Sequence, residues 1–349
     1  MSSVTRYAAV NTKIRALEGK LLKNHDYLAL MSKRSVAQIA QYLKEKTHYK
    51  DALRDVDPQN IHRGRLEVIL KKNLLDNLNK VTYYFHGNHS RFVEGLFMRY
   101  EIEDLKILIR AVYTDRDFTN FKDSLVYIGR YSSIDYKALA GANTFAQLID
   151  ALKGTEYYRY LLPLKGKEQQ EGQFGIEMAL DLAYFSLFER HIKLLPKKEQ
   201  IILKKIMGMQ ADLLNLQWIY RGLKFYKLPP EELLNYTINF GSRLKYKDIK
   251  ALCYSKDTDE LEHRMLNTRY KFLFTHGLTK DIFVERRILR YQYLKLMELR
   301  HKGEMNISQT IIYFHLLECE IRDIISVIEA IRYSIDGVQQ IKRYLIRKI

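Results

Sequence analysis

Three pairs of side chains, each spaced three residues apart, are the first candidates for chemistry in this sequence. In each pair a carboxylate precedes an Asp or Asn, within RYEIEDLKILIRAVY at 99–113, ADLLNLQWIYRGL at 211–223 and CEIRDIISVIEAIRY at 319–333. Three-residue spacing places both members of a pair on one face of a helix. Two carboxyl groups held in this way could act as a general acid and a general base. The pairs are Glu101 with Asp104, Asp212 with Asn215, and Glu320 with Asp323.

The threefold recurrence of the pairs favours a structural role over a catalytic one. A catalytic group is rarely placed at three equivalent positions of one chain. A basic residue also stands six positions after the second member of the first two pairs, as Arg110 and Arg221, which favours internal ion pairing. The third pair has Glu329 at that place, so any salt bridge there must differ. We interpret the pairs as sources of helix-to-helix hydrogen bonds that fix the packing of each repeat.

Histidine pairs offer a second kind of chemistry, a metal site. Two of them have the ExxH spacing of di-iron helix bundles, and one flanks Gly87 in an expected loop. None of these histidines recurs in the other repeats, so we expect neither a metal ion nor another cofactor. The sequence also lacks the GxxxxGK[ST], GxGxxG, GxSxG and HExxH motifs. The histidine candidates are His86 with His89, Glu260 with His263, and Glu298 with His301.

Composition and charge limit the classes of function. The 349 residues are 47% hydrophobic and 28% charged with only 5 prolines, which predicts a folded, helix-rich protein. The formal net charge of +17 predicts an acidic partner, whether nucleic acid, an anionic membrane face or acidic protein subunits. Two scattered cysteines favour a reducing cytoplasm. No apolar run reaches the roughly 20 residues of a membrane span, so we expect a chain that does not cross the bilayer.

The pairs belong to a longer repeat that is written three times. Each copy has a DxxAL element near its start, then a TxY motif and a helix-opening glutamate, and it has the pair near its end. The distance from that glutamate to the second member of the pair is 37, 38 and 38 residues. The repeat predicts one all-helical unit for each copy. The landmarks are Asp26, Asp135 and Asp248; Tyr49, Tyr157 and Tyr270; and Glu67, Glu177 and Glu285.

These landmarks predict an all-α chain of three copies, at residues 19–113, 129–223 and 241–333. The corresponding domain boundaries are 1–116, 117–228 and 229–349, the last with a C-terminal helix. In the first copy, apolar spacing predicts helices within 4–23, 35–44, 64–85 and 100–113, with a short bridge at 26–30. Triplication by itself permits a linear array as well as a closed arrangement.

The motifs also carry a family resemblance. RxLExKLL at 15–22, DYLAL at 26–30 and TxY at 47–49 follow one another in the first copy. Together with the triplicated helical unit, they resemble the rotary V-type ATPase subunit that is called C in bacteria and archaea and d in eukaryotes. The resemblance covers essentially the whole chain, and its specificity comes from the ordered triplication. The lack of long insertions favours a bacterial or archaeal protein.

The resemblance implies a funnel of three similar helical domains around a pseudo-threefold axis. One copy per complex would receive the D-type and F-type shaft subunits and sit on the membrane proteolipid ring at the cytoplasmic face. It would transmit torque between ATP chemistry and H+ or Na+ transport, without catalytic residues, cofactor or small-molecule substrate. The alternative from another class is a basic helical-repeat protein that binds nucleic acid, and an ExxH metalloenzyme is a more distant one. The basic clusters are spread over all copies, which favours solvated helix faces over a nucleic-acid surface.

Overall fold

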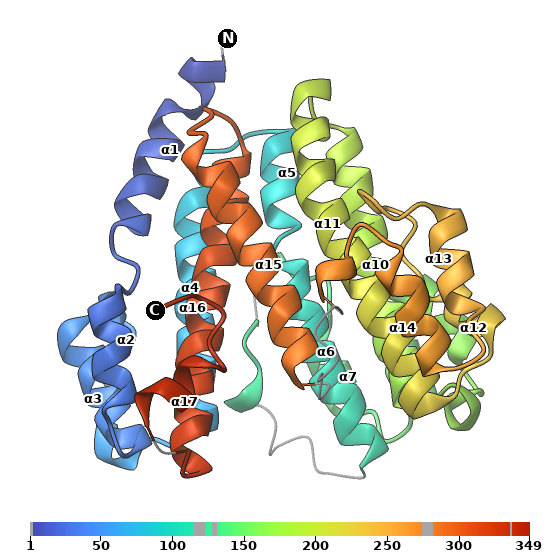
Figure 1. Cartoon of the computed structure of the whole chain (residues 1–349), viewed down its shortest axis with the longest axis horizontal. Helices are drawn as coiled ribbons and strands as arrows, with labels where there is room; N and C mark the ends of the chain where they lie inside the picture. Colours follow the sequence, from blue (N-terminus) through green and yellow to red (C-terminus); the bar gives the residue numbers. More distant parts are fainter. Residues whose placement is uncertain (1–2, 115–122, 128–130, 274–281, 336) are drawn as a thin grey trace. The chain divides into compact units, whose positions relative to one another are not determined.

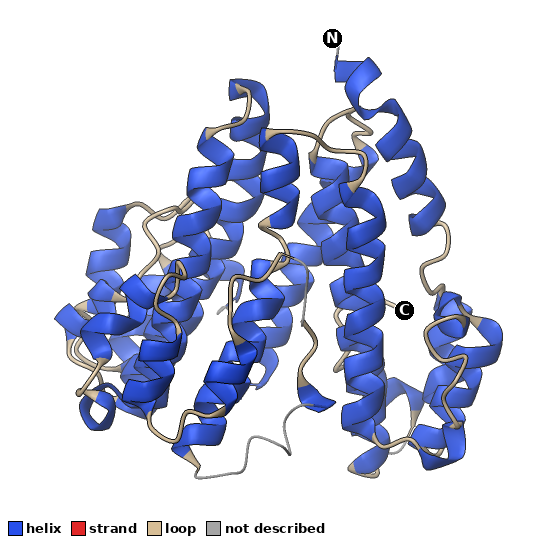
Figure 2. Ribbon diagram, turned by 180° about the vertical axis from the view of Figure 1, so that it is seen from behind, coloured by secondary structure: helices blue, strands red, loops and turns tan. Residues whose placement is uncertain are grey.

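The computed structural model describes residues 3–114, 123–127, 131–273, 282–335 and 337–349. Within these ranges every regular element is a helix, and no strand occurs among them (Figure 2). The prediction of an all-α chain is confirmed.

The chain forms two compact units. Unit 1 combines residues 1–85 with residues 276–349, and unit 2 comprises residues 86–275. Unit 1 therefore joins the beginning of the first copy to the end of the third copy. The helices of unit 1 are α1 (Ser3–Glu18), α2 (Asn24–Met31), α3 (Val36–Lys46), α4 (Arg63–Thr82), α15 (Ile282–His301), α16 (Ser308–Arg332) and α17 (Val338–Lys342), as labelled in Figure 1.

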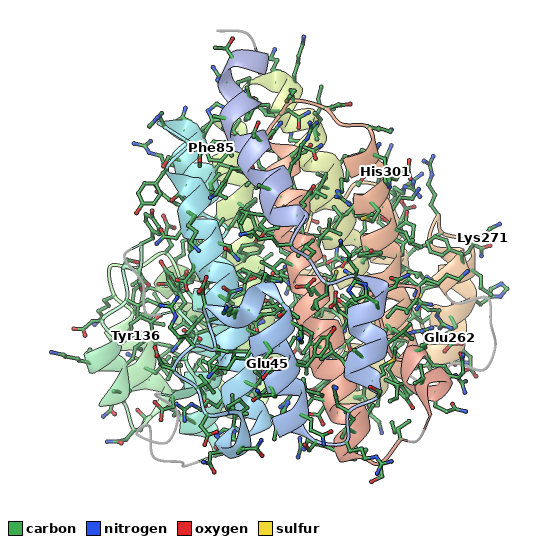
Figure 3. All side chains as sticks on the ribbon, turned by 90° about the vertical axis from the view of Figure 1, so that its left-hand side faces the viewer. Glu45, Phe85, Tyr136, Glu262, Lys271 and His301 are labelled. Carbon is green, nitrogen blue, oxygen red and sulfur yellow. The ribbon has the colours of Figure 1, made fainter. Side chains whose placement is uncertain are left out.

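Helix α16 is the centre of unit 1. It packs against the long helices α1, α4 and α15 and against the short helices α2, α3 and α17. Figure 3, in which Glu45 marks α3, shows the short helices lying against the long ones. Aliphatic side chains of α16 recur at helical spacing and are fully buried, among them Ile324, Val327 and Ile328. Burial of such a stripe is the main source of stability for a helix of this kind.

Unit 2 contains two long packed pairs of helices. Helix α6 packs against α10, and α10 also packs against α11. Short helices attach to these pairs, α8 to α6 and α13 to α11. The helices of unit 2 are α5 (Asn88–Glu94), α6 (Met98–Tyr113), α7 (Tyr136–Ala140), α8 (Phe145–Ala151), α9 (Tyr158–Leu161), α10 (Glu168–Lys193), α11 (Lys197–Arg221), α12 (Pro230–Asn235), α13 (Tyr246–Cys253) and α14 (Thr258–Leu266).

The long helices of the first copy lie where apolar spacing places them. Helix α4 occupies most of the predicted range 64–85, and Leu66, Leu70 and Leu74 on its stripe are buried. Helix α6 contains the predicted range 100–113. These two predictions are confirmed because long amphipathic helices bury a continuous stripe, which is the strongest signal in a sequence.

The bridge predicted at 26–30 is wrong, because these residues lie within helix α2. The Asp26 carboxylate accepts the Lys23 backbone N–H at 2.8 Å and so caps the start of the helix. Asp248 caps α13 in the same way, accepting the Lys245 N–H at 2.9 Å. The DxxAL element is therefore a helix start. The loop predicted around Gly87 is also shorter than expected, because α5 begins at Asn88 and carries His89.

Candidate functional site

The first member of each pair accepts a hydrogen bond from the tyrosine of the TxY motif in the following copy. Glu101 of α6 accepts from the hydroxyl of Tyr157. Asp212 of α11 accepts from the hydroxyl of Tyr270 at 2.8 Å. We call α6, α11 and α16 the spine helices, because each carries one pair.

The third spine helix continues this pattern on the first copy. Glu320 of α16 accepts from the hydroxyl of Tyr49 at 3.0 Å, although 271 residues separate the two in sequence. The same carboxylate accepts the Leu22 backbone N–H at 2.6 Å, and its Oε1 lies 2.7 Å from Nε2 of His48. The last copy is therefore bonded to the first copy within unit 1.

The loop that leads into each short helix supplies further donors to these carboxylates. Asp212 accepts the backbone N–H groups of Ser242 at 3.1 Å, Arg243 at 2.7 Å and Leu244 at 3.3 Å. Leu244 stands four residues before Asp248, as Leu22 stands four residues before Asp26. In the second copy the side-chain hydroxyl of Ser132 donates to Glu101 instead. All three carboxylates thus fix the same loop of the following copy.

The second members of the first two pairs bond a stretch of backbone further along the chain. Asp104 accepts the backbone N–H groups of Val126 at 2.9 Å and Tyr127 at 2.6 Å. Asn215 accepts the N–H of Ile238 at 2.8 Å and donates its amide to the carbonyl of the same residue at 2.8 Å. An amide can do both, whereas a carboxylate can only accept, which explains the different pairing.

Asp323 does the same for the C-terminal stretch. It accepts the backbone N–H groups of Ile346 at 2.5 Å and Arg347 at 3.3 Å. The guanidinium of Arg347 donates to the carbonyl of Leu22 at 2.8 Å and lies over the ring of Tyr27. The C-terminal residues are therefore attached to both the third spine helix and the first copy.

The pairs are buried, and burial sets the pKa values of their carboxyl groups. Five of the six side chains are fully buried, and Glu101 is 3% exposed. Burial raises the pKa of Glu101, although the hydrogen bonds from Ser132 and Tyr157 act to lower it. Burial likewise raises the pKa of Asp212, although its backbone donors act to lower it. For Asp323 burial raises the pKa to about 6, although backbone N–H groups and Arg347 oppose the shift.

Glu177, the second of the three landmark glutamates, contacts the spine helix α6 near its C-terminal end. It lies inside α10, which begins at Glu168, and not at the start of a helix as predicted. Nε of Arg110 on α6 lies 2.9 Å from Oε1 of Glu177 on α10. Burial alone would raise the pKa of Glu177, and hydrogen bonds from Arg110 and Gln173 outweigh it, so that this pKa is lowered.

In unit 1 the spine helix supplies the carboxylate, and the guanidinium comes from α4. Glu329 of α16 stands where α6 has Arg110, and it pairs with Arg63 of α4 at 2.7 Å. Arg63 also pairs with Glu67 at 3.0 Å, so one guanidinium joins two carboxylates that would otherwise repel each other. Arg221 corresponds to Arg110, and Glu285 corresponds to Glu177. These two residues belong to different units, since Arg221 ends α11 in unit 2 and Glu285 lies on α15 in unit 1.

Two contacts of these helices were not anticipated from sequence. Nζ of the buried Lys106 on α6 lies 2.6 Å from Asp181 on α10, and His48 contacts Glu320. His48 is the middle residue of its TxY motif, a position that varies among His, Glu and Arg in the three copies. Lys106 shares its side of α6 with Glu103 and Arg110, so the charge pattern did not indicate that it is buried with a partner.

The paired carboxylates are engaged by the protein itself. Each paired carboxylate is buried and already accepts protein donors, so it is not free to take a proton from a substrate. Within the described ranges no cluster of three or more His, Cys, Asp or Glu side chains is placed to hold a metal ion. His89 pairs with Glu199 at 2.9 Å, Glu260 pairs with Arg264 at 2.7 Å, and Glu298 pairs with Lys295 at 2.7 Å.

Among the residues that the structure describes, no helix combines the length and the apolar character that crossing a bilayer requires.

Comparison with known proteins gives one consistent family. The model of the ATP synthase (C/AC39) subunit family matches residues 10–344. The C subunit of the A-type ATP synthase of Methanosarcina mazei is 25% identical over 315 residues, covering 88% of this chain and 84% of the relative. The protein of the same name from Pyrococcus horikoshii is 23% identical over 337 residues, covering 94% and 87%. The chain therefore belongs to the ATP synthase (C/AC39) subunit family.

Proposed function

We propose that this chain is the non-catalytic rotor adaptor of a rotary ATPase. Membership of the family makes it a subunit of such a complex, with partners inside that complex. In our proposal it receives the central shaft, formed by D-type and F-type subunits, and sits on the membrane proteolipid ring at the cytoplasmic face. One copy per complex transmits torque between ATP chemistry and the transport of H+ or Na+.

The observation that carries this proposal is the sequential bonding of the copies. The spine carboxylates of the first and second copies bond the TxY tyrosine of the next copy, and Glu320 bonds Tyr49 of the first. An element that transmits torque must resist twisting, and buried hydrogen bonds between successive copies oppose relative movement of the copies. We therefore favour a closed arrangement over a linear array.

The proposal extends to the arrangement of the domains. We propose three similar helical domains, at 1–116, 117–228 and 229–349, placed around a pseudo-threefold axis as a funnel. In each of them a spine helix would supply the paired side chains that hold the following domain. The formal charge of +17 supports acidic partners, namely shaft subunits and an anionic membrane surface.

A binding experiment tests this proposal against the nucleic-acid alternative. The purified chain is mixed with a tagged complex of the D-type and F-type shaft subunits at moderate salt, and retention on the tag is measured. We expect retention, and we expect no ATP hydrolysis by the chain alone. Loss of shaft binding together with tight, salt-dependent binding to nucleic acid would overturn the adaptor role in favour of the alternative.

A further inference from the structure

Two basic pockets occupy equivalent positions in the first and third copies. The Lys23 pocket, in unit 1, has a volume of ≈ 370 Å³ and lies between the start of α2 and the TxY motif. The Lys245 pocket, in unit 2, has a volume of ≈ 510 Å³ and lies between the start of α13 and the TxY motif of its own copy. Lys23 and Lys245 each stand three residues before the helix-capping aspartate.

Both pockets carry an excess of positive charge. Four lysines and two aspartates line the Lys23 pocket, an excess of two. Five basic residues and one aspartate line the Lys245 pocket, an excess of four. The basic residues are Lys20, Lys23, Lys46 and Lys50 in the first pocket, and Arg243, Lys245, Lys247, Arg264 and Arg269 in the second.

The aspartates of the Lys23 pocket are already engaged. Asp26 accepts from the Lys23 N–H and the Tyr42 hydroxyl, and Asp51 pairs with Arg54 at 2.8 Å. None of the four lysines of this pocket forms an ion pair within the described ranges. Their charges are therefore available to a ligand.

The Lys245 pocket shows the same imbalance. Its aspartate, Asp248, caps α13, and Arg264 is held by Glu260. Lys245, Lys247 and Arg269 are exposed and form no ion pair among the residues that the structure describes.

The second copy shows that the fold does not need this charge. Ser132 stands in place of Lys23 and Lys245, and Ile134 in place of Lys247. Glu156 stands in place of Arg269 and pairs with Arg190 at 2.7 Å. The short helices α7 and α8 form in this copy all the same. Because like charges gathered in a pocket cost stability, their presence in two copies needs a reason other than folding.

We propose that the Lys23 and Lys245 pockets bind phosphate-type anions, either a free phosphate compound or the phosphate of a lipid headgroup. Several separate cations around a cavity suit a tetrahedral dianion, whose oxygens accept from several sides, better than a single carboxylate. An excess of two positive charges matches one phosphate dianion. The volumes fall within the range of small-molecule sites, which leaves room for the group that carries the phosphate. The proposal does not depend on the shaft and ring contacts proposed above.

The test measures phosphate binding to the full chain by titration calorimetry at constant ionic strength. We expect two saturable sites for inorganic phosphate. Replacing the basic residues of the Lys245 pocket by those of the second copy, as Lys245→Ser, Lys247→Ile and Arg269→Glu, should weaken one site at least tenfold. These residues are compatible with the fold because the second copy uses them. A Lys20→Ser, Lys23→Ser and Lys46→Ser variant should weaken the other site.

A control variant changes net charge by the same amount on exposed positions of α11, as Lys198→Glu, Lys204→Ser and Lys205→Ile. It should bind phosphate like the unmodified chain. Sedimentation with phosphatidylcholine vesicles, with and without phosphatidic acid, separates the two sources of phosphate. Binding only to the vesicles with phosphatidic acid, or much tighter binding to them, assigns a lipid headgroup. Binding to inorganic phosphate alone assigns a free phosphate compound. Binding in neither arm, or equal losses in the pocket and control variants, would overturn the proposal.

Discussion

At the scale of single residues, the paired carboxylates act as acceptors for backbone N–H groups that no regular element pairs. Asp104 serves two such groups, those of Val126 and Tyr127. A buried N–H without an acceptor costs about 1–3 kcal/mol. Asp104, which could have been half of an acid and base pair, therefore satisfies buried backbone N–H groups.

Replacing Asp104 by leucine should lower the free energy of unfolding by about 2–4 kcal/mol, because it leaves both N–H groups without an acceptor. Asp104→Asn should cost less, since Asn215 performs the equivalent task in the second copy. Urea unfolding followed by circular dichroism measures both. If Asp104→Leu kept full stability and lost shaft binding, α6 would have a direct contact role instead.

Asp323 should make stability depend on pH. Its pKa is about 6 in the folded protein, against an ordinary value of 3.8. Between these values the folded protein binds more protons than the unfolded chain, so this group's contribution to the free energy of unfolding falls as pH rises from about 4 to 6. The total change is up to about 3 kcal/mol. Urea unfolding at several pH values measures this dependence. Asp323→Asn should remove the fall in the free energy of unfolding between about pH 4 and 6, whereas Asp259→Asn, at an exposed position, should keep it. The same pH dependence in both variants and the unmodified chain would contradict the prediction.

At the scale of elements, the spine helices show what a sequence reveals and what it leaves hidden. The positions of Glu101, Asp212 and Glu320 could be predicted because the spacing repeats within single helices. Their partners could not, because each lies in another copy and several are backbone N–H groups, which carry no signature in sequence. Helix α2 was missed for a similar reason, since eight residues are too few for a clear apolar stripe.

The contact between α16 and α4 tests whether the arginine of this ion pair can be moved from one helix to the other. Glu329→Arg should lower the free energy of unfolding by about 0.5–1 kcal/mol, because the new guanidinium faces Arg63; the effect is modest as both side chains are partly exposed. Adding Arg63→Ala should recover at least half of this loss, since the introduced arginine would then face Glu67 as Arg110 faces Glu177. Urea unfolding of the single and double variants measures the recovery. No recovery would mean that Arg63 also stabilises α4 by itself.

At the scale of the whole molecule, the two compact units do not coincide with the three copies of the sequence. Unit 1 is built from the first part of the first copy and the last part of the third. Its central contact joins Glu320 to Leu22, His48 and Tyr49. In unit 2, Asp212 plays the equivalent part for the third copy. Each unit thus contains its own complete spine contact, and each should open as a unit.

Hydrogen exchange followed by mass spectrometry tests this division. Glu320→Gln weakens the acceptor for three donors in unit 1, so exchange should accelerate together in α2, α3 and α16 and stay unchanged in α11 and α13. Asp212→Asn should do the reverse. A local loss of about 2 kcal/mol corresponds to roughly 30-fold faster exchange through opening. If either variant accelerated exchange equally in both units, the two units would open together, and the predicted separate opening would be wrong.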